Sequence, residues 1–408
     1  MKCRHCGSPL GLVFLDLGHQ PPSNAYLTAE QLEKPETWYP LKVFVCEQCW
    51  LVQIPELARA VELFTADYAY YSSVSSIWVE HARDYVAMIV KRLGLGDTSL
   101  VVELASNDGY LLQFMHERGI QCLGIEPTAS TAEAARRKGI ETLEIFFGME
   151  NAKCLAAERG RADLIIGNNV LAHVPDINDF VGGICRLLAP GGIATLEFPH
   201  LLRLVEGMQF DTVYHEHYSY LSLHAVRTIF ESRGLCILDV EELPTHGGSL
   251  RVYAGRAGDD APGRSPAVDR ILELERSAGM LDPGFYTRLQ PRAEQVKYDL
   301  LGFLLERKKE GETVAGYGAA AKGNSLLNYA GIGSDLLPFV CDAAPSKQGK
   351  YLPGSHIPIV PADRLDQARP DYVLIFPWNI RDEIMQELEQ VRSWGGRFVT
   401  AVPGLHIQ

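Results

Sequence analysis

The densest cluster of proton-transfer groups in the chain is the run Tyr214-His215-Glu216-His217-Tyr218. Histidine titrates near neutral pH, and a neighbouring carboxylate or phenol can orient its ring. A lone histidine is more often packed in a core than catalytic, but five consecutive polar and aromatic residues beside an expected ligand crevice favour function. We therefore expect acid–base chemistry in this run.

A further histidine precedes two glycines in His246-Gly247-Gly248. Glycine lets a backbone approach a ligand closely, and the histidine is a second candidate donor. His200 ends the apolar run that comes before the histidine-rich cluster. We assign four of these residues to a substrate site: His200, His246, Gly247 and Gly248.

A turn of small and acidic residues, Glu103-x-Ala105-x-Asn107-Asp108-Gly109, lies between an apolar run and a helical pattern. Such a turn and helix start can bring backbone amides to a ligand. Its acids would repel the pyrophosphate of a dinucleotide, but they suit a ligand with ammonium and sulfonium centres. Glu126 ends the next apolar run, where an acid can accept hydrogen bonds from ribose hydroxyls. The pattern predicts S-adenosylmethionine, although an ordinary turn with solvated acids is the alternative.

Two asparagines, Asn168 and Asn169, follow the third apolar run. The carboxyl ends of parallel strands line the ligand crevice of such sheets, so we expect both to face cofactor or substrate. His173 could equally cap the next helix, and we give it no catalytic role. The predicted cofactor contacts are Glu103, Ala105, Asn107, Asp108, Gly109, Glu126, Pro127, Asn168 and Asn169.

Four of the nine cysteines form two pairs, Cys3-x-x-Cys6 and Cys46-x-x-Cys49. The two-residue spacing lets both thiolates of a pair reach one tetrahedral ion, and two pairs complete a closed four-cysteine site. A redox pair would need a single such motif at a helix start of a thioredoxin-like unit, which the sequence does not show. We predict a structural zinc ion with no open position for catalysis.

Near the C-terminus, the sequence Gly316-Tyr317-Gly318-Ala319-Ala320-Ala321-Lys322-Gly323-Asn324 resembles a phosphate-cradling turn with a basic residue added. It is not a Walker A motif, which requires a different spacing. Lys322 and Asn324 are candidate contacts for a diphosphate. A plain packing turn explains the glycines equally well.

Apolar runs at residues 99–104, 122–125, 163–167 and 193–198 alternate with helical patterns. This alternation predicts a parallel sheet built from α/β units. A helical region at residues 267–311 then leads into a last α/β segment. That segment repeats the order of strands, turns and strand-end acids of the middle one. The repetition favours the interpretation that one nucleotide-binding unit was duplicated, although all doubly wound sheets share some of these features.

We therefore expect an α/β protein of three parts. A four-cysteine zinc-binding module covers residues 1–75, a class I methyltransferase (Rossmann-like) domain covers residues 76–255, and a C-terminal Rossmann-like domain covers residues 267–408. A chain of 408 residues is long enough for these separate cores.

The charge balance is 38 basic against 51 acidic residues, a net charge of −13. Binding along nucleic acid needs a basic face, so we expect no nucleic-acid partner. No apolar run approaches the length of a membrane span, and the residues after Met1 lack the apolar core of a signal peptide. We expect a cytoplasmic protein without a membrane partner, and a monomer is compatible with the sequence.

Taken together, these motifs resemble the nucleotide-sugar C-methyltransferases of deoxysugar biosynthesis. The likeness runs nearly from end to end and includes the cysteine pairs, Asn107-Asp108-Gly109, Gly124-Ile125-Glu126-Pro127, Glu216-His217, His246-Gly247-Gly248, the turn that ends at Lys322, Trp378-Asn379, and Val402-Pro403-x-Leu405-His406-Ile407. Ala105 departs from the family, because relatives often carry glycine there.

The resemblance implies S-adenosylmethionine in the middle domain and a nucleotide-linked 4-keto sugar between the middle and C-terminal domains. The family's base corresponds to His217, with Tyr214 and Glu216 beside it. His217 would remove the proton at C3 of the sugar, and Tyr214 would also contact the substrate. The sequence does not settle whether the carrier is dTDP or GDP.

Two other functions compete with this one. An oxidoreductase or epimerase of nucleotide sugars would need a nicotinamide cofactor, which Glu103 and Asp108 disfavour. A zinc-ribbon adaptor for protein or nucleic acid is disfavoured by the net charge of −13 and by the intact run from Tyr214 to Tyr218.

Overall fold

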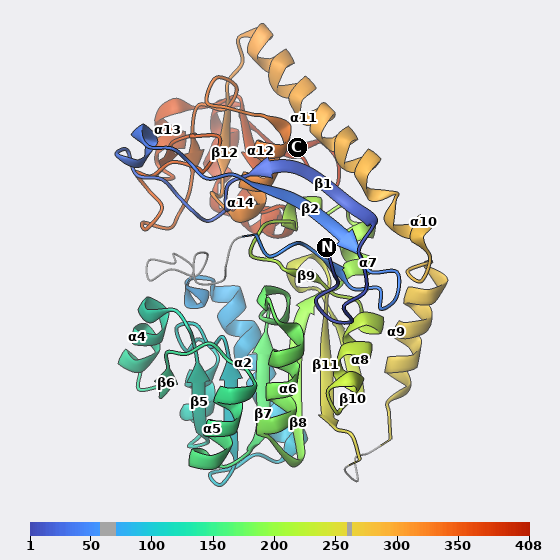
Figure 1. Cartoon of the computed structure of the whole chain (residues 1–408). Helices are drawn as coiled ribbons and strands as arrows, with labels where there is room; N and C mark the ends of the chain where they lie inside the picture. The colour runs from blue at the N-terminus through green and yellow to red at the C-terminus, as the bar shows by residue number, and fades with distance from the viewer. Residues whose placement is uncertain (58–70, 259–262) are drawn as a thin grey trace.

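The computed structural model of the chain describes residues 1–57, 71–258 and 263–408. These residues form three β-sheets with helices packed around them (Figure 1). The α/β class and its Rossmann-like sheets are confirmed.

The N-terminal sheet has four antiparallel strands in the order β1-β2-β3-β9. They are β1 (Leu12–Gln20), β2 (Tyr39–Val45), β3 (Val52–Gln53) and β9 (Ser219–Tyr220). Strand β9 comes from the middle of the chain and pairs with β3, Val52 opposite Tyr220. The N-terminal sheet therefore holds, through backbone hydrogen bonds, the segment that directly follows the histidine-rich run.

The middle sheet has seven strands in the order β10-β11-β8-β7-β4-β5-β6. They are β4 (Leu100–Leu104), β5 (Gln121–Ile125), β6 (Thr142–Leu143), β7 (Ala162–Asn168), β8 (Leu188–Pro199), β10 (Leu235–Leu243) and β11 (Ser249–Arg256). The four apolar runs in the sequence fall on β4, β5, β7 and β8, so these predicted strands are confirmed.

Helices cover both faces of the middle sheet. One face packs against α5 (Met149–Arg159), α6 (Ile177–Leu187) and α8 (Leu223–Ser232). The other packs against α2 (Ser76–Leu93), α3 (Leu112–His116) and α4 (Ala129–Arg137). A short helix, α7 (Leu201–Glu206), follows β8. Because both faces are buried, the central strands are apolar throughout instead of alternating.

The C-terminal sheet has six strands in the order β14-β13-β12-β15-β16-β17. They are β12 (Val314–Tyr317), β13 (Val340–Cys341), β14 (Ile359–Val360), β15 (Tyr372–Ile375), β16 (Arg397–Thr400) and β17 (His406–Ile407). Helix α9 (Pro266–Ser277) packs on α8 and β10 of the middle domain. The helices that follow it are α10 (Pro283–Tyr286), α11 (Leu289–Glu310), α12 (Ala321–Ala330), α13 (Arg364–Ala368) and α14 (Arg381–Glu387).

The middle and C-terminal sheets share one topology. Strands β6-β5-β4-β7-β8 and β14-β13-β12-β15-β16 are parallel and follow the same order, and each set ends on an antiparallel neighbour, β11 or β17. The acids that end the second strands also match, since Glu126 and Asp342 each accept the backbone N–H two residues later. This correspondence agrees with duplication of one unit.

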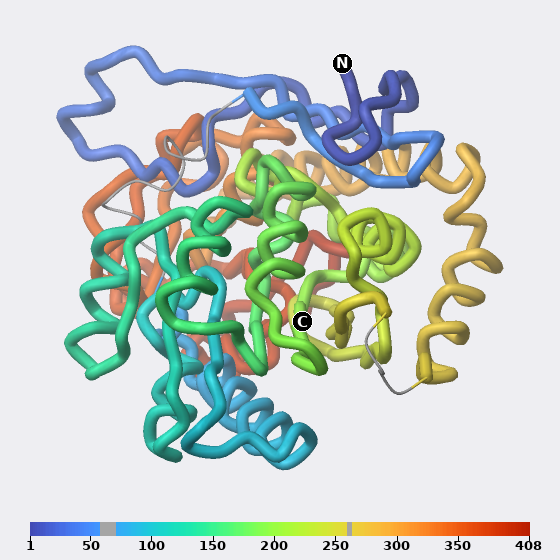
Figure 2. Tube along the Cα trace, turned by 60° about the horizontal axis from the view of Figure 1, so that its bottom comes forward, coloured from blue at the N-terminus to red at the C-terminus, as the bar shows by residue number. Residues whose placement is uncertain are grey.

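The N-terminal sheet packs on the C-terminal domain, far along the chain. Phe14, Leu15 and Val43 share one apolar core with residues of α11 and α12 such as Leu289 and Leu327. Figure 1 shows β1 and β2 running across these helices, and Figure 2 shows the same blue and orange segments side by side. Within the described residues, no helix is long and apolar enough to span a membrane.

Among the described residues, seven short 3-10 turns connect these elements, and five of them reach the site described below. The turns are η1 (Gln31–Glu33), η2 (Ser72–Val74), η3 (Leu171–His173), η4 (Phe210–Thr212), η5 (Thr245–Gly247), η6 (Trp378–Ile380) and η7 (Glu389–Trp394). Turns η2 to η6 carry Ser72, His173, Thr212, His246 and Asn379, which all line one cavity.

Candidate active site

A cavity of about 870 Å³ lies where the three parts of the chain meet. The N-terminal part contributes Asn24 and Tyr26, and the C-terminal domain contributes Lys322 and Lys347. Eleven of the predicted site residues line it: Ala105, Asn107, Glu126, Pro127, Asn168, Asn169, Tyr214, Glu216, His217, His246 and Lys322. The fold therefore places residues that are far apart in sequence around one cavity.

His217 lies on the cavity wall, and its hydrogen bonding fixes which ring nitrogen carries the proton. Nδ1 lies 2.9 Å from the backbone oxygen of Thr212, which can only accept, so Nδ1 must donate. In the neutral ring, Nε2 is then left with a lone pair and no proton. This is the tautomer that a general base requires.

The surroundings keep His217 neutral. Burial lowers its pKa well below the usual value, the neighbouring His173 lowers it further, and the bond to Thr212 opposes both effects. The His173 ring lies edge-on at 4.6 Å between ring centroids, and the Tyr214 ring lies at 4.0 Å on an inclined plane. His173 received no role from the sequence, yet it contacts the predicted base.

Glu216 connects the histidine-rich run to the N-terminal part. Its carboxylate is buried, and Oε1 accepts a hydrogen bond of 2.7 Å from the side-chain amide of Asn24. Asn24 is thus a site residue that the sequence reasoning missed, and no local pattern marks it.

His246 faces the same space from the other side. Its Nε2 accepts a 3.0 Å hydrogen bond from the amide nitrogen of Asn169, and the Trp78 ring lies 5.1 Å from its own. Burial, with a smaller contribution from the nearby charge of Lys322, lowers the pKa of His246 to about 4. His246 is therefore a neutral donor through Nδ1 at physiological pH.

Lys322 begins α12 at the C-terminal side of the cavity. Its Nζ donates to Asn379 Oδ1 at 2.7 Å and lies 4.3 Å from the centre of the Trp378 ring. Burial lowers the pKa of Lys322, whereas the carboxylate of Asp211 raises it. The contacts with Asn379 and Trp378 hold the ammonium group of Lys322 at the cavity wall.

At the opposite end, the turn after β4 and the end of β5 form a pocket edged by acids. Glu126 accepts backbone hydrogen bonds from Asn107 and Thr128, both at 2.9 Å, one on each oxygen. The side chains of Thr128 and Thr131 also hydrogen-bond to this carboxylate, and Glu126 lines the cavity. This geometry fits a ligand with ribose hydroxyls.

Glu103 lies behind this edge and is fully buried. Within the part of the chain that the structure describes, its Oε2 has no hydrogen-bond partner. Burial, together with Glu126 and Asp108, raises the pKa of Glu103 well above its usual value. A positively charged ligand would relieve this crowding of acids. The donor set therefore fits S-adenosylmethionine.

Asp108 differs from its predicted role. Its Oδ2 pairs with Lys138 at 3.0 Å and accepts from the Ser73 hydroxyl, so its charge is already balanced within the protein. Neither Asp108 nor the adjacent Gly109 lines the cavity. Ala105 does line it, and it adopts a left-handed φ of 56°, a conformation that glycine adopts without strain.

Other predicted substrate residues have partners within the fold. The His200 ring is buried and lies 2.8 Å from Glu275 Oε1, and the two oxygens of Glu275 also accept the N–H groups of Leu223 and His224 at the start of α8. Asn324 donates to the backbone oxygen of Ser23 at 2.5 Å. Neither His200 nor Asn324 lines the cavity, so neither is placed to contact a substrate there.

The two glycines after His246 are explained by packing. A Cβ on Gly247 would lie 2.5 Å from the Gln209 amide nitrogen, and one on Gly248 would lie 2.7 Å from Arg203. Both glycines also have positive φ angles, of 85° and 116°. They make room for the protein's own side chains, and neither of them lines the cavity.

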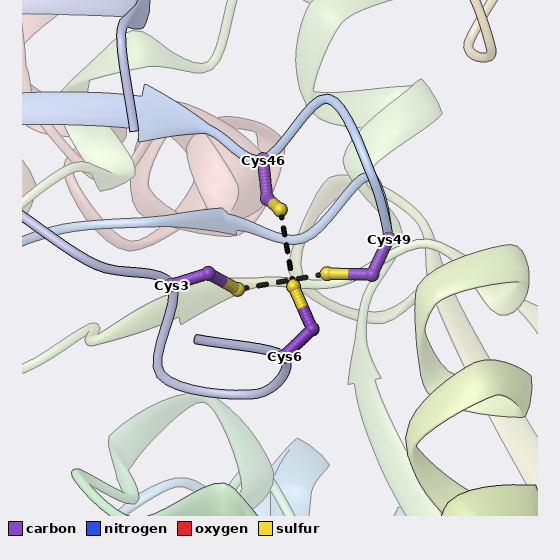
Figure 3. A group of neighbouring side chains, drawn as sticks. All are labelled: Cys3, Cys6, Cys46 and Cys49. Carbon is purple, nitrogen blue, oxygen red and sulfur yellow. Dashed lines mark hydrogen bonds between the residues drawn. The ribbon is translucent and has the colours of Figure 1, made fainter. Parts of the chain in front are cut away.

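The four N-terminal cysteines converge on one point (Figure 3). Their sulfur atoms lie within 4.8 Å of one another, with Cys3 and Cys49 3.6 Å apart and Cys6 and Cys46 3.5 Å apart. Tetrahedral zinc with Zn–S bonds of about 2.3 Å needs sulfur atoms roughly 3.8 Å apart. The four thiols therefore fit a closed zinc site.

The two cysteine pairs have the same backbone geometry. Gly7 N–H donates to the Cys3 oxygen at 3.0 Å, and Trp50 N–H donates to the Cys46 oxygen at 2.8 Å. Gly7 and Trp50 both have left-handed φ angles, of 75° and 58°. The turns aim both thiols of each pair inward.

The zinc module is anchored next to the cavity. Arg4 donates to the backbone oxygens of Pro175 and Ile54, at 2.5 and 2.6 Å. The His5 ring meets the Asn178 side chain at 2.8 Å. Pro175 lines the cavity, so the metal site supports its wall.

Three family models together match most of the chain. A model of a zinc binding domain matches residues 3–64, one of a methyltransferase domain matches residues 78–240, and one of a C-methyltransferase C-terminal domain matches residues 244–403. C-methyltransferase NovU of Streptomyces niveus is 37% identical over 402 residues, covering 98% of this chain and 95% of that protein.

Three further likenesses each cover less than half of this chain. A ubiquinone biosynthesis O-methyltransferase of Chelativorans sp. is 29% identical over 94 residues, 23% of this chain and 37% of that protein. The structure of PH0226 from Pyrococcus horikoshii aligns with a TM-score of 0.38 and 14% identity, over 46% of this chain and 95% of that one. Magnesium protoporphyrin IX methyltransferase of Synechocystis, with bound S-adenosylmethionine, gives a TM-score of 0.33 and 18% identity, over 44% and 82%.

Replacing one zinc ligand tests the metal site. We expect the Cys46→Ala variant to lose the single zinc ion of the chain and to melt at a lower temperature, because three thiolates cannot close the tetrahedron. Atomic emission gives the zinc content, and calorimetry gives the melting temperature. Cys154→Ala removes an exposed thiol outside the cluster and is the matched control. Full zinc content in Cys46→Ala would rule out the four-cysteine site.

Proposed function

The chain belongs to the C-methyltransferase family and is an S-adenosylmethionine-dependent enzyme, and from this premise we propose that it methylates C3 of a nucleotide-linked 4-keto deoxysugar carried on dTDP. The observation that carries this proposal is His217, a neutral histidine at the cavity wall whose Nδ1 donates to a backbone carbonyl. Methylation at carbon needs a base that removes a C–H proton, and the unprotonated Nε2 can serve as that base. Methyl transfer to a more acidic group would not need such a base.

The reaction starts with proton removal. A C–H bond next to a ketone is acidic enough for a positioned base, provided that the enolate oxygen is stabilised. Nε2 of His217 takes the C3 proton, and the electron pair of the C–H bond enters the enolate. S-adenosylmethionine, when bound, supplies a methyl group on positively charged sulfur for the C3 carbon to attack.

Tyr214 is placed to assist the enolate. Its ring lies against that of His217, with 4.0 Å between the ring centroids, and it lines the cavity. A phenol donates to a developing oxyanion more strongly than to a ketone, and this difference lowers the barrier. Glu216, tied to Asn24, holds the run in register and lies beside the base.

The two ends of the cavity suit two different ligands. Glu126, Ala105, Asn107, Pro127 and the two asparagines edge the end next to β4 and β5, which we assign to the cofactor. Lys322 and Lys347 line the C-terminal side, which suits a diphosphate. A GDP carrier would use the same two cations. A nicotinamide oxidoreductase is disfavoured because the matching family models and the full-length relative are methyltransferases.

Replacing the base tests the central step. We expect His217→Gln to lose turnover by at least about 100-fold, because glutamine keeps the size and polarity but cannot take up a proton. Methyl transfer to a dTDP-4-keto-6-deoxyhexose is measured by the release of S-adenosylhomocysteine. Binding of S-adenosylhomocysteine, measured by titration calorimetry, should be unchanged. His116→Gln, an exposed histidine on α3, is the control. Near-normal turnover in His217→Gln would exclude it as the base.

The pH dependence gives an independent check on the wild-type enzyme. The base works only when neutral, and the pKa of His217 lies below the ordinary histidine value. We expect log kcat/KM for the sugar to stay level from pH 8 down through about 6.5 and to fall only at lower pH. A fall centred at pH 7 or above contradicts this protonation state.

A third prediction concerns the diphosphate. We expect Lys322→Ala to weaken dTDP binding by about tenfold, the usual effect of losing one charge-assisted hydrogen bond. Thymidine, which lacks the phosphates, should bind equally well to both proteins. Lys309→Ala, an exposed lysine on α11, controls for the loss of a charge. Unchanged dTDP affinity in Lys322→Ala would show that the diphosphate lies elsewhere.

A further inference from the structure

We propose that Asp211 is a positioning residue for the base: through Trp378 of the C-terminal domain, it fixes the Thr212 carbonyl and so keeps the proton of His217 on Nδ1. The proposal deepens the proposed function and rests on it. It assigns a role to a buried acid that lies only three residues before the histidine-rich run and that the mechanism otherwise leaves unused.

The C-terminal domain holds the peptide of Thr212 from both sides. On one side, the indole N–H of Trp378 donates to Asp211 Oδ2 at 2.8 Å. On the other side, the Ser325 hydroxyl of α12 donates to the Val213 backbone oxygen at 2.8 Å. Both residues next to Thr212 are therefore anchored to elements more than 100 residues away in sequence.

Local hydrogen bonds make this segment rigid. The Thr212 hydroxyl and its N–H both bond to the Gln209 backbone oxygen, at 2.6 and 3.0 Å. The orientation of the Thr212 carbonyl thus follows the orientation of η4 as a whole. Because that carbonyl accepts from His217 Nδ1, a shift of η4 removes the only interaction that we find selecting this tautomer among the described residues.

The chemistry of Asp211 argues against a purely structural role. The residue is 1% exposed, and no described residue donates a hydrogen bond to its Oδ1. Burial raises the pKa of Asp211 and outweighs the opposing effects of Lys322 and the Trp378 bond, so that this pKa is about 6. A buried carboxylate with one unsatisfied oxygen costs stability that an apolar residue would not. Its presence is explained if the bond to Trp378 serves catalysis.

The same indole also meets the substrate side. Lys322 lies over the Trp378 ring and donates to the adjacent Asn379, and it lines the cavity. One side chain of the C-terminal domain thus contacts both the lysine proposed for the diphosphate and the acid that anchors the base. Docking of the C-terminal domain and orientation of the base are mechanically linked.

The test removes the indole N–H and keeps the ring. We expect Trp378→Phe to lower kcat by at least about tenfold with little change in KM for the sugar, since a small misplacement of a base is costly. Trp394→Phe is the matched control, because Trp394 also donates its indole N–H, to the Pro370 oxygen at 3.0 Å, in the same domain but away from the cavity. Equal losses in both variants would overturn the proposal.

Two further measurements separate positioning from folding. In ¹⁵N-histidine-labelled protein without substrate, the His217 signal, identified by its absence in His217→Gln, should report the Nδ1–H tautomer. Trp378→Phe and Asp211→Ala should both show a mixture of tautomers. Asp211→Asn keeps an acceptor for Trp378 and should restore the wild-type signal and kcat. A pure Nδ1–H signal in Trp378→Phe, or an Asp211→Asn variant as impaired as Asp211→Ala, would contradict the proposal, whatever the sugar turns out to be.

Discussion

One hydrogen bond, from His217 Nδ1 to the Thr212 carbonyl, determines what the cavity can do. It places the lone pair of a neutral imidazole toward a space shared by three parts of the chain. Strand β9, directly after His217, pairs with β3, which begins three residues after Cys49. Segment 211–213, directly before the run, is anchored by the C-terminal domain. The base is therefore held where all three parts meet, and none of them alone would orient it.

In this arrangement, the zinc module and the C-terminal domain both help to hold the base in place. The cysteine turns fix β3 and Arg4, and both contact the cavity wall or the strand that follows the base. The C-terminal domain repeats the topology of the middle domain. In the C-terminal domain, however, protein side chains occupy part of the position that corresponds to the cofactor site of the middle domain. Lys347 contacts Asp342 and the Ala319 oxygen there, and the Tyr26 hydroxyl also donates to that oxygen. The second unit thus presents cations to the shared cavity.

Local sequence patterns predicted the elements well and their long-range contacts poorly. The strands, the zinc cysteines and Glu126 have signals that are short in sequence: apolar runs, paired spacing, and an acid at a strand end. His200 and Asn324 looked like ligand contacts because they are polar residues next to strand ends or turns. Their partners, Glu275 and Ser23, lie 75 and 301 residues away, and no local pattern encodes such pairs. His173 and Asp211 stand close to recognised motifs and could have been nominated by that proximity, whereas Asn24 could not.

The position of the new methyl group in the product tests the account most directly. A dTDP-4-keto-6-deoxyhexose is incubated with the enzyme and S-adenosylmethionine carrying a ¹³C-methyl group, and the product is examined by carbon–proton correlation NMR. We predict a ¹³C-methyl bonded to C3, the carbon beside the ketone. A methyl on C5, the other flanking carbon, would contradict the assigned position while keeping the enolate chemistry. A methyl on oxygen would contradict the role of His217 as a carbon-acid base.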